Sequence, residues 1–378
     1  RWNACDAIRW FCKVVDRGTR RLPECATRSN ARRATRRGAA AIMRRKQLAE
    51  RIAGVVSGLP AVEHAVAYGS AVLTNASFAD SSAALDVLVA VSDPVKWHEE
   101  NMRVNPSHYA LQMRMCGAAG VDGLARTVGA ATHFNARLAD ASGRAFKYGV
   151  VSVDDCVKDL EVWNHLFVAG RLHKPHETVR ACDAVTRAQA RNARSAANAA
   201  LLTLPESFTE LEFHRAIVRL SYDGDVRFLF AAEDESKVER IARSNGEGLR
   251  EAYEDVVREL LDASVVNVRS TGAWSQDVSP ETLRGRVNTL PDTVMAMLRN
   301  VRGLDASADA AAVAESVCAS VGDDPERVGG AVRACVRQIV RASTLRQAVA
   351  GLLSTSPLKT IAYVGAKFVK SAQSRTSG

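Results

Sequence analysis

The chain has 378 residues, of which 47% are hydrophobic and 25% are charged, with a formal net charge of +9. This composition is ordinary for a globular protein of two or three domains. No run of about 18 apolar residues occurs, which excludes a helical membrane span, so any membrane contact is expected to be peripheral. The eight cysteines show no two-residue spacing, which argues against a zinc or redox site.

The positive charge is concentrated at the two ends of the chain. Residues 1–45 hold twelve arginines and one lysine against three acidic residues, a net of +10, and residues 357–378 carry a net of +4. The intervening body is therefore slightly acidic, which argues against a nucleic-acid partner. An Arg-rich, acid-poor start is typical of an organelle transit peptide, and a disordered basic tail without a targeting role is the alternative.

Hydrophobic periodicity predicts a small α/β unit in the first half of the chain. Residues 85–91 are almost wholly apolar, which is typical of a strand buried on both faces. The expected elements, in chain order, are a helix over 47–59, strands over 61–68 and 85–91, a helix over 97–103, a strand over 146–153, and a helix capped by Asp154 and Asp155 that runs to Ala169.

Helices dominate the second half of the prediction. They are expected over 185–204, 208–220, 237–261, 291–298, 308–321 and 328–370, the last one interrupted at Pro357. Thr209 and Glu212 have the spacing of a capping box at the start of the second of these helices.

The strongest chemical signal lies between the first two strands. Tyr68, Gly69 and Ser70 follow an apolar run, and Asp86 stands near the start of the next one. Glycine lets a backbone approach a triphosphate closely, and serine adds a hydroxyl donor. An acid within an apolar strand is costly unless it is paired or binds a metal. The pattern is that of a nucleotidyltransferase site in which Asp86 binds Mg²⁺.

This pattern leaves an alternative open. Many nucleotidyltransferases carry a second acid two positions further on, and here that position is Leu88. Asp86 would then be a strand-start acid that bonds to backbone amides.

A resemblance along the chain favours the catalytic interpretation. The residues that carry it are Tyr68–Ser70, Leu85–Asp86, Asp93–Pro94, Trp97–His98, Asn101, Asn105, His108–Tyr109, Lys147–Ser152, Ala169–Leu172, Lys174–Pro175, Leu204–Phe208, Leu220–Tyr222, Gly224–Asp225, Arg227, Arg341, Ser343, Arg346–Gln347 and Ile361–Tyr363. Through these residues the sequence, from about residue 47 to residue 370, resembles the mitochondrial translocator assembly and maintenance family, the peripheral mitochondrial CDP-diacylglycerol synthases.

The resemblance implies an architecture. An α/β nucleotidyltransferase-like domain is followed by a mostly helical, winged-helix-like domain and a helical C-terminal tail. The expected boundaries are a basic presequence-like segment over 1–45, a nucleotidyltransferase domain over 46–185, a helical substrate-closing domain over 186–300, and a C-terminal region over 301–378.

The resemblance also implies a reaction, in which phosphatidic acid attacks CTP to give CDP-diacylglycerol and pyrophosphate for cardiolipin synthesis. The nucleotide is expected to bind Tyr68, Gly69, Ser70, Lys147, Asp225 and Arg227. Asp86 and Lys147 are expected to be catalytic, and Asp86 would hold Mg²⁺. For Asp225 and Arg227, local capping is the alternative.

A polar group after the second strand, formed by Asn101, His108 and Tyr109, is a candidate part of the substrate cleft. The alternative is that these side chains fix an irregular loop by hydrogen bonds.

The predicted location is the matrix side of the mitochondrial inner membrane. Residues 358–369 combine apolar residues with lysines, which is typical of a basic amphipathic helix on an anionic membrane surface. Two other functions remain possible: a nucleotidyltransferase with a different acceptor, and a non-enzymatic assembly factor for protein import. The sequence carries no signal for oligomeric state.

Overall fold

The computed structural model describes residue 43 and residues 45–73, 84–229, 236–269 and 272–354. Contacts divide the chain into Arg1–Arg51 and Ile52–Gly378. The described residues of the first unit are helical, and this helix continues to residue 57. The predicted membrane-binding end over 357–378 lies outside the described residues, as does nearly all of the basic segment over 1–45.

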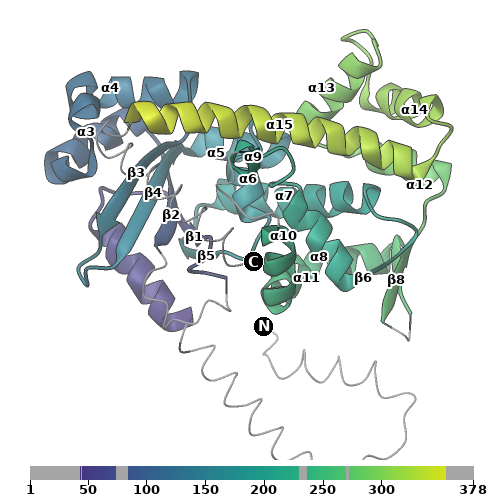
Figure 1. The fold of residues 1–378 in the computed structure, drawn as a ribbon, viewed down its shortest axis with the longest axis horizontal. Coiled ribbons are helices and arrows are strands. Elements are labelled where there is room, and N and C mark those ends of the chain that lie inside the picture. The colour runs from purple at the N-terminus through teal and green to yellow at the C-terminus, as the bar shows by residue number, and fades with distance from the viewer. Residues whose placement is uncertain (1–42, 44, 74–83, 230–235, 270–271, 355–378) are drawn as a thin grey trace, which may run out of the picture. The chain divides into compact units, whose positions relative to one another are not determined.

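A five-stranded sheet forms the centre of the N-terminal half of the second unit (Figure 1). Its order is β3-β4-β2-β1-β5. The central pair β2 and β4 is parallel, and the other three pairs are antiparallel. The strands are β1 (His64–Tyr68), β2 (Leu85–Val91), β3 (His133–Ala139), β4 (Ala145–Ser152) and β5 (Glu177–Arg180).

The register of these strands decides which side chains share a face of the sheet. Asp86 pairs with Tyr68 of β1 and with Lys147 of β4. Because side chains alternate along a strand, Asp86 and Lys147 project from one face and Tyr148 from the other. The face that carries Asp86 also carries Leu88, which belongs to the main hydrophobic core.

Helices cover both faces of this sheet. Trp97 of α3 contacts the ring of Tyr148 on one face, whereas Cys156 and Leu160 of α5 join the core on the other. The helical segments of this half are α3 (Pro94–Val104), η1 (Pro106–His108), α4 (Leu111–Thr127), α5 (Val153–Val162) and α6 (Val168–Leu172).

The second half is mostly helical and contains a small antiparallel sheet of order β6-β8-β7. Its strands are β6 (Ser207–Thr209), β7 (Val266–Val268) and β8 (Ala273–Gln276). Its helices are α7 (Asp183–Leu202), α8 (Glu210–Arg219), α9 (Val226–Leu229), α10 (Lys237–Ser244), α11 (Gly246–Asp262), α12 (Pro280–Asn288), α13 (Asp292–Val301), α14 (Ala310–Ser320) and α15 (Pro325–Ser354).

The long helix α15, yellow in Figure 1, connects distant parts of the second unit. Its Gln347 accepts a hydrogen bond from the Ala130 amide at 3.1 Å, just before β3. Its Thr344 hydroxyl accepts one from the Val226 amide at 3.3 Å, at the start of α9. The C-terminal helix therefore contacts both the sheet-containing half and the helical half.

Two predicted helices are wrong in detail. The helix expected from Asp154 to Ala169 ends at Val162, because Trp163 adopts a left-handed conformation with φ of 57°, and α6 follows separately. The N-cap of α5 is Ser152 and not Asp154 or Asp155, and the Ser152 side chain accepts a hydrogen bond from the Asp155 amide. The helix expected over 237–261 is broken at Asn245 into α10 and α11.

The other expected strands and helices have counterparts at similar positions, except that residues 355–370 of the last expected helix, with Pro357, lie outside the described residues. The Thr209–Glu212 capping box is present. A mixed α/β fold is therefore confirmed. The winged-helix-like arrangement and the domain boundaries stay predictions. Among the described residues, no helix combines the length and the apolarity that a bilayer span requires.

Candidate active site

The turn after β1 lies directly against Asp86. Gly69 has φ of 79°, in the left-handed region, and its carbonyl accepts from the amides of Val72 and Leu73 at 3.0 and 3.1 Å. A Cβ atom at Gly69 would lie 2.9 Å from Asp86 Oδ2. Glycine is therefore required here by conformation and by space, and the Gly-Ser turn lies against the acid.

Lys147 is the ionic partner of Asp86. Its Nζ lies 3.4 Å from Asp86 Oδ1, with side-chain exposures of 39% and 19% respectively. Burial raises the pKa of Asp86 above its ordinary value, although the charges of Lys147 and Arg171 oppose this shift. Within the described part of the chain, the carboxylate is held by a lysine rather than by backbone amides, which argues against the structural alternative.

Arg171 on α6 lies beside the same turn. Its guanidinium carbon is 3.5 Å from the centre of the Phe167 ring and 5.6 Å from that of Tyr68, the residue before Gly69. Arg171 Nη1 donates to the Phe167 carbonyl at 2.6 Å. These contacts hold the guanidinium in one place next to the Gly-Ser turn.

Lys174, two residues after α6, joins this region to the turn that precedes α9. It is buried, and its Nζ donates to the Gly170 carbonyl and, at 2.7 Å, to the Ser221 hydroxyl. Burial holds the pKa of Lys174 well below its ordinary value. A Cβ atom at Gly170 would lie 2.7 Å from Ser221 Cβ, so the two segments pack closely.

Asp225 and Arg227 form a pair at the end of that turn. Arg227 Nε donates to both carboxylate oxygens of Asp225 at 3.0 Å, and the Arg227 amide donates to Oδ1 at 2.9 Å. Burial raises the pKa of Asp225, but the Arg227 contacts outweigh burial and the net shift is downward. The local capping expected as the alternative is therefore present, and a substrate role for this pair stays a prediction.

The polar group of Asn101, His108 and Tyr109 lies at the other face of the sheet. Asn101 Nδ2 donates to the hydroxyls of Tyr109 and Tyr148, both at 2.8 Å, and His108 Nδ1 lies 2.8 Å from the Tyr148 hydroxyl. Because Tyr148 projects away from the Asp86 face, the structure does not bring these residues to the candidate site. Their network fits the alternative of a hydrogen-bonded loop.

The carboxylate of Asp86 suits a magnesium ion shared with a substrate. Among the described residues, no group of three or more histidine, cysteine or acidic side chains could hold a metal. Mg²⁺ commonly binds one or two carboxylates together with substrate phosphates and water. Asp86 beside an open glycine turn fits that mode and does not fit an all-protein cage.

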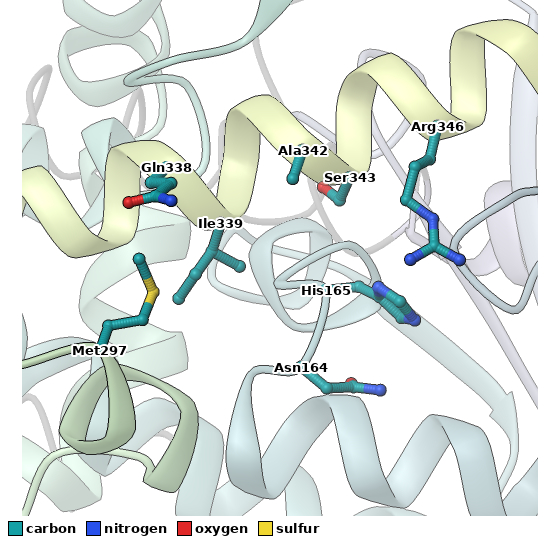
Figure 2. Close-up of a pocket in the computed structure, with 8 residues that line it drawn as sticks. All are labelled: Asn164, His165, Met297, Gln338, Ile339, Ala342, Ser343 and Arg346. Atoms are coloured by element: carbon teal, nitrogen blue, oxygen red, sulfur yellow. The ribbon is translucent and has the colours of Figure 1, made fainter. Parts of the chain in front are cut away.

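A cavity of about 240 Å³ lies away from these residues, between the α5–α6 connection, α13 and α15 (Figure 2). Asn164, His165 and Met297 line it together with residues of α15, and none of the predicted site residues does. The Arg346 guanidinium at its edge donates to the carbonyls of Arg126, Thr127 and Val128 at the end of α4. These hydrogen bonds hold α15 against the end of α4, so the residues around the cavity serve the packing of helices.

The chain matches over residues 52–370 the family described as phosphatidate cytidylyltransferase, mitochondrial. The chain belongs to this family. The family predicted from the sequence is thereby confirmed.

Members of the phosphatidate cytidylyltransferase family from animals are similar over most of their length. The mouse protein, named phosphatidate cytidylyltransferase, mitochondrial, is 36% identical over 310 residues, covering 81% of this chain and 89% of its own. The human protein of the same name is 35% identical, covering 77% of this chain and 63% of its own. The Caenorhabditis elegans protein of that name is 30% identical, with coverage of 85% and 98%.

The sequence-based site omitted two cationic residues that the fold brings to this region. Arg171 and Lys174 both lie within segments that carry the family resemblance, but no role was predicted for them. Their place near Asp86 and Asp225 depends on how α6 packs, which no local pattern specifies. The family resemblance of Ala169–Leu172 and Lys174–Pro175 is the sequence signal that could have indicated them.

Proposed function

We propose that this chain is a phosphatidate cytidylyltransferase that uses CTP and phosphatidic acid to make CDP-diacylglycerol and pyrophosphate. The observation that supports this most directly is the contact between Gly69 and Asp86, in a chain of this family. A glycine turn with a carboxylate beside it matches what a nucleotidyltransferase needs for a triphosphate.

The predicted nucleotide-binding and catalytic residues each have a role in the proposal. Tyr68, Gly69 and Ser70 bind the nucleotide, with the Gly69 turn next to the triphosphate. Lys147 donates to a phosphate oxygen, and its position 3.4 Å from Asp86 supports a site where cation and carboxylate act together. Asp86 would hold Mg²⁺, which when bound neutralises phosphate charge.

Asp225 and Arg227 are proposed to contact substrate from the helical half. Arg227 is exposed and is oriented by Asp225 through its Nε. The planar guanidinium, oriented in this way, matches the geometry of a phosphate group.

The reaction itself requires alignment more than proton transfer. A phosphate oxygen of phosphatidic acid attacks the α-phosphorus of CTP. A new phosphorus–oxygen bond forms, the bond to the bridging oxygen of the β-phosphate breaks, and pyrophosphate leaves with that electron pair. Because the attacking phosphate is already ionised near neutral pH, no strong general base is required, and positioning and charge stabilisation dominate.

The proposed location is the matrix face of the mitochondrial inner membrane, where the product would feed cardiolipin synthesis. The relatives are named mitochondrial, and the described residues hold no membrane-spanning helix. Residues 357–378 would bind the anionic surface peripherally, without a nucleic-acid partner.

The test is thin-layer detection of CDP-diacylglycerol from purified protein, labelled CTP, magnesium and phosphatidate. Formation of this lipid supports the proposal. Transfer of label to a different acceptor in a parallel panel would favour another nucleotidyltransferase, and absence of transfer to any acceptor would favour the assembly-factor alternative.

A further inference from the structure

Arg171 interacts electrostatically with both carboxylates of the candidate site. Its charge acts on Asp86 and also on Asp225, from one side chain on α6. Its guanidinium carbon lies 5.9 Å from the centre of the Phe134 ring, and Lys147 Nζ lies 6.0 Å from the same centre. Arg171 and Lys147 therefore both lie close to the Phe134 ring, and Arg171 also lies close to Tyr68, the residue before Gly69.

The short helix that carries Arg171 is fixed at both ends. The buried carboxylate of Asp159 accepts from four backbone amides before and within α6, at 2.7 to 3.1 Å. At the other end, Lys174 ties the Gly170 carbonyl to the Ser221 hydroxyl. Because α6 is held at both ends, the Arg171 guanidinium keeps its position without a ligand. This lowers the conformational entropy that is lost when an anion binds.

The contacts of Arg171 leave part of its hydrogen-bonding capacity unused. Among the described residues, no carboxylate oxygen lies within 4 Å of it, and its buried Nε has no hydrogen-bond partner. Its Nη1 donates to the Phe167 carbonyl. An arginine normally offers five N–H groups, so several remain for a ligand.

Two cations around one ring repel each other unless an anion lies near both. Asp86 offsets this for Lys147, because it lies 3.4 Å from the ammonium. Asp86 and Asp225 act on Arg171 only from beyond ion-pair distance, so a phosphate group beside Gly69 would supply a direct partner to its guanidinium. Its planar fork matches two phosphate oxygens at once, which a lysine cannot do.

We propose that Arg171 is a further substrate-binding residue, which contacts a phosphate group beside the Gly69 turn. This inference rests on the proposed function. The phosphate is either part of the CTP triphosphate or the headgroup of the lipid acceptor, and the experiment below distinguishes these sources.

The experiment compares Arg171→Met, Arg171→Lys and Arg187→Met with the wild-type chain. Arg187 is an exposed arginine of α7 and serves as the matched control. CTP binding is measured by titration calorimetry without lipid, and the KM for phosphatidate is measured in mixed micelles at saturating CTP. Loss of hydrogen bonds to a charged group predicts roughly tenfold to hundredfold weaker binding for Arg171→Met, a smaller loss for Arg171→Lys, and none for Arg187→Met.

The two arms give distinct results. Weaker CTP binding assigns Arg171 to the triphosphate, and an unchanged CTP affinity with a raised phosphatidate KM assigns it to the acceptor. Unchanged values in both arms for Arg171→Met overturn the inference. If Arg171→Met has a lowered melting midpoint, the Arg171→Lys variant decides. A wild-type CTP affinity and a wild-type phosphatidate KM in Arg171→Lys, at an unchanged melting midpoint, would overturn the contact between the guanidinium and a phosphate.

A failure of the proposed cytidylyltransferase activity can be distinguished from a failure of the inference about Arg171. If the wild-type chain binds no CTP, titration with inorganic pyrophosphate still tests the anion site. Binding by wild type that is weakened in Arg171→Met supports the inference without the activity, and equal binding by both contradicts it.

Discussion

Asp86 and Lys147 stand side by side on the two central strands, with Oδ1 and Nζ 3.4 Å apart. This relationship follows from the register, since β2 and β4 are parallel and pair these two residues directly. The antiparallel neighbour β1 ends at Tyr68, which pairs with Asp86, so the Gly69 turn reaches the same carboxylate. Three strands thus deliver a glycine turn, an acid and a lysine to one edge of the sheet.

Replacing Gly69 with alanine is expected to impair nucleotide binding and stability together. The left-handed φ costs about 1–2 kcal/mol for a residue with a Cβ atom, and that atom would press on Asp86 Oδ2. Gly143 is a matched control, because its φ is 77° but nothing lies within 4 Å of an added Cβ atom.

Thermal melting and the KM for CTP would check this. Gly143→Ala should lower the melting midpoint without changing the KM, whereas Gly69→Ala should change both. Equal effects of the two substitutions would show that the contact with Asp86 has no functional consequence.

Tyr148→Phe is expected to destabilise the chain without weakening CTP binding. The Tyr148 hydroxyl contacts Asn101, His108 and Asn135, and its removal leaves these buried groups without that partner. The cost is on the order of 1–3 kcal/mol of unfolding free energy. Urea unfolding and the KM for CTP are the measurements, and a raised KM at unchanged stability would instead favour the substrate-cleft prediction for Asn101, His108 and Tyr109.

Stability is expected to fall as the pH is lowered below about 6.5, the ordinary pKa of histidine. Burial lowers the pKa of His133 to about 4 and that of His173 to about 3. Between those values and 6.5 the unfolded chain binds protons that the folded chain does not, so acid favours unfolding. By pH 5, each of these two histidines lowers the free energy of unfolding by about 2 kcal/mol relative to neutral pH.

Urea unfolding from pH 7.5 to pH 4.5 measures this dependence. His133→Gln should reduce the slope against pH, since one titrating group is removed. A stability that stays constant from pH 6.5 to pH 5 would be inconsistent with neutral, buried histidines in the folded chain.

Deleting residues 357–378 is expected to weaken vesicle binding and lipid turnover. The segment carries three lysines and one arginine without an acid, and each basic residue near an anionic surface contributes about 1 kcal/mol. A shorter deletion of 371–378 removes only Arg375 among these and serves as the control. Sedimentation with phosphatidate vesicles is the measurement, and equal binding by both truncated chains and the full chain would rule out a membrane role.

The sequence predicted the strands of the site well, because their signals are local. The run Leu85–Val91 is apolar except for Asp86, and the structure buries it at the centre of the sheet. The closeness of Gly69 and Asp86 was predicted from the strand–turn–strand pattern. It appears directly in the register of β1 and β2.

Other features had no local signal. Helix α4 contains Gly117, Gly120 and Gly123, which obscure a helical pattern, and Gly117 has non-helical backbone angles within it. The end of α5 depends on a left-handed Trp163, a conformation that sequence does not favour for tryptophan. The position of Arg171, which lies near the same Phe134 ring as Lys147, depends on the tertiary packing of the five-residue helix α6.

The central claim is that Asp86 supports nucleotidyl transfer at the Gly69 turn. The most direct test compares CDP-diacylglycerol formation by the wild-type chain and Asp86→Asn over a series of magnesium concentrations, with the exposed Asp154→Asn as control. We expect Asp86→Asn to lose activity by roughly a hundredfold or more at every magnesium concentration, with an unchanged melting midpoint and with Asp154→Asn at wild-type rates. Full activity in Asp86→Asn would contradict the assignment of this carboxylate to the reaction.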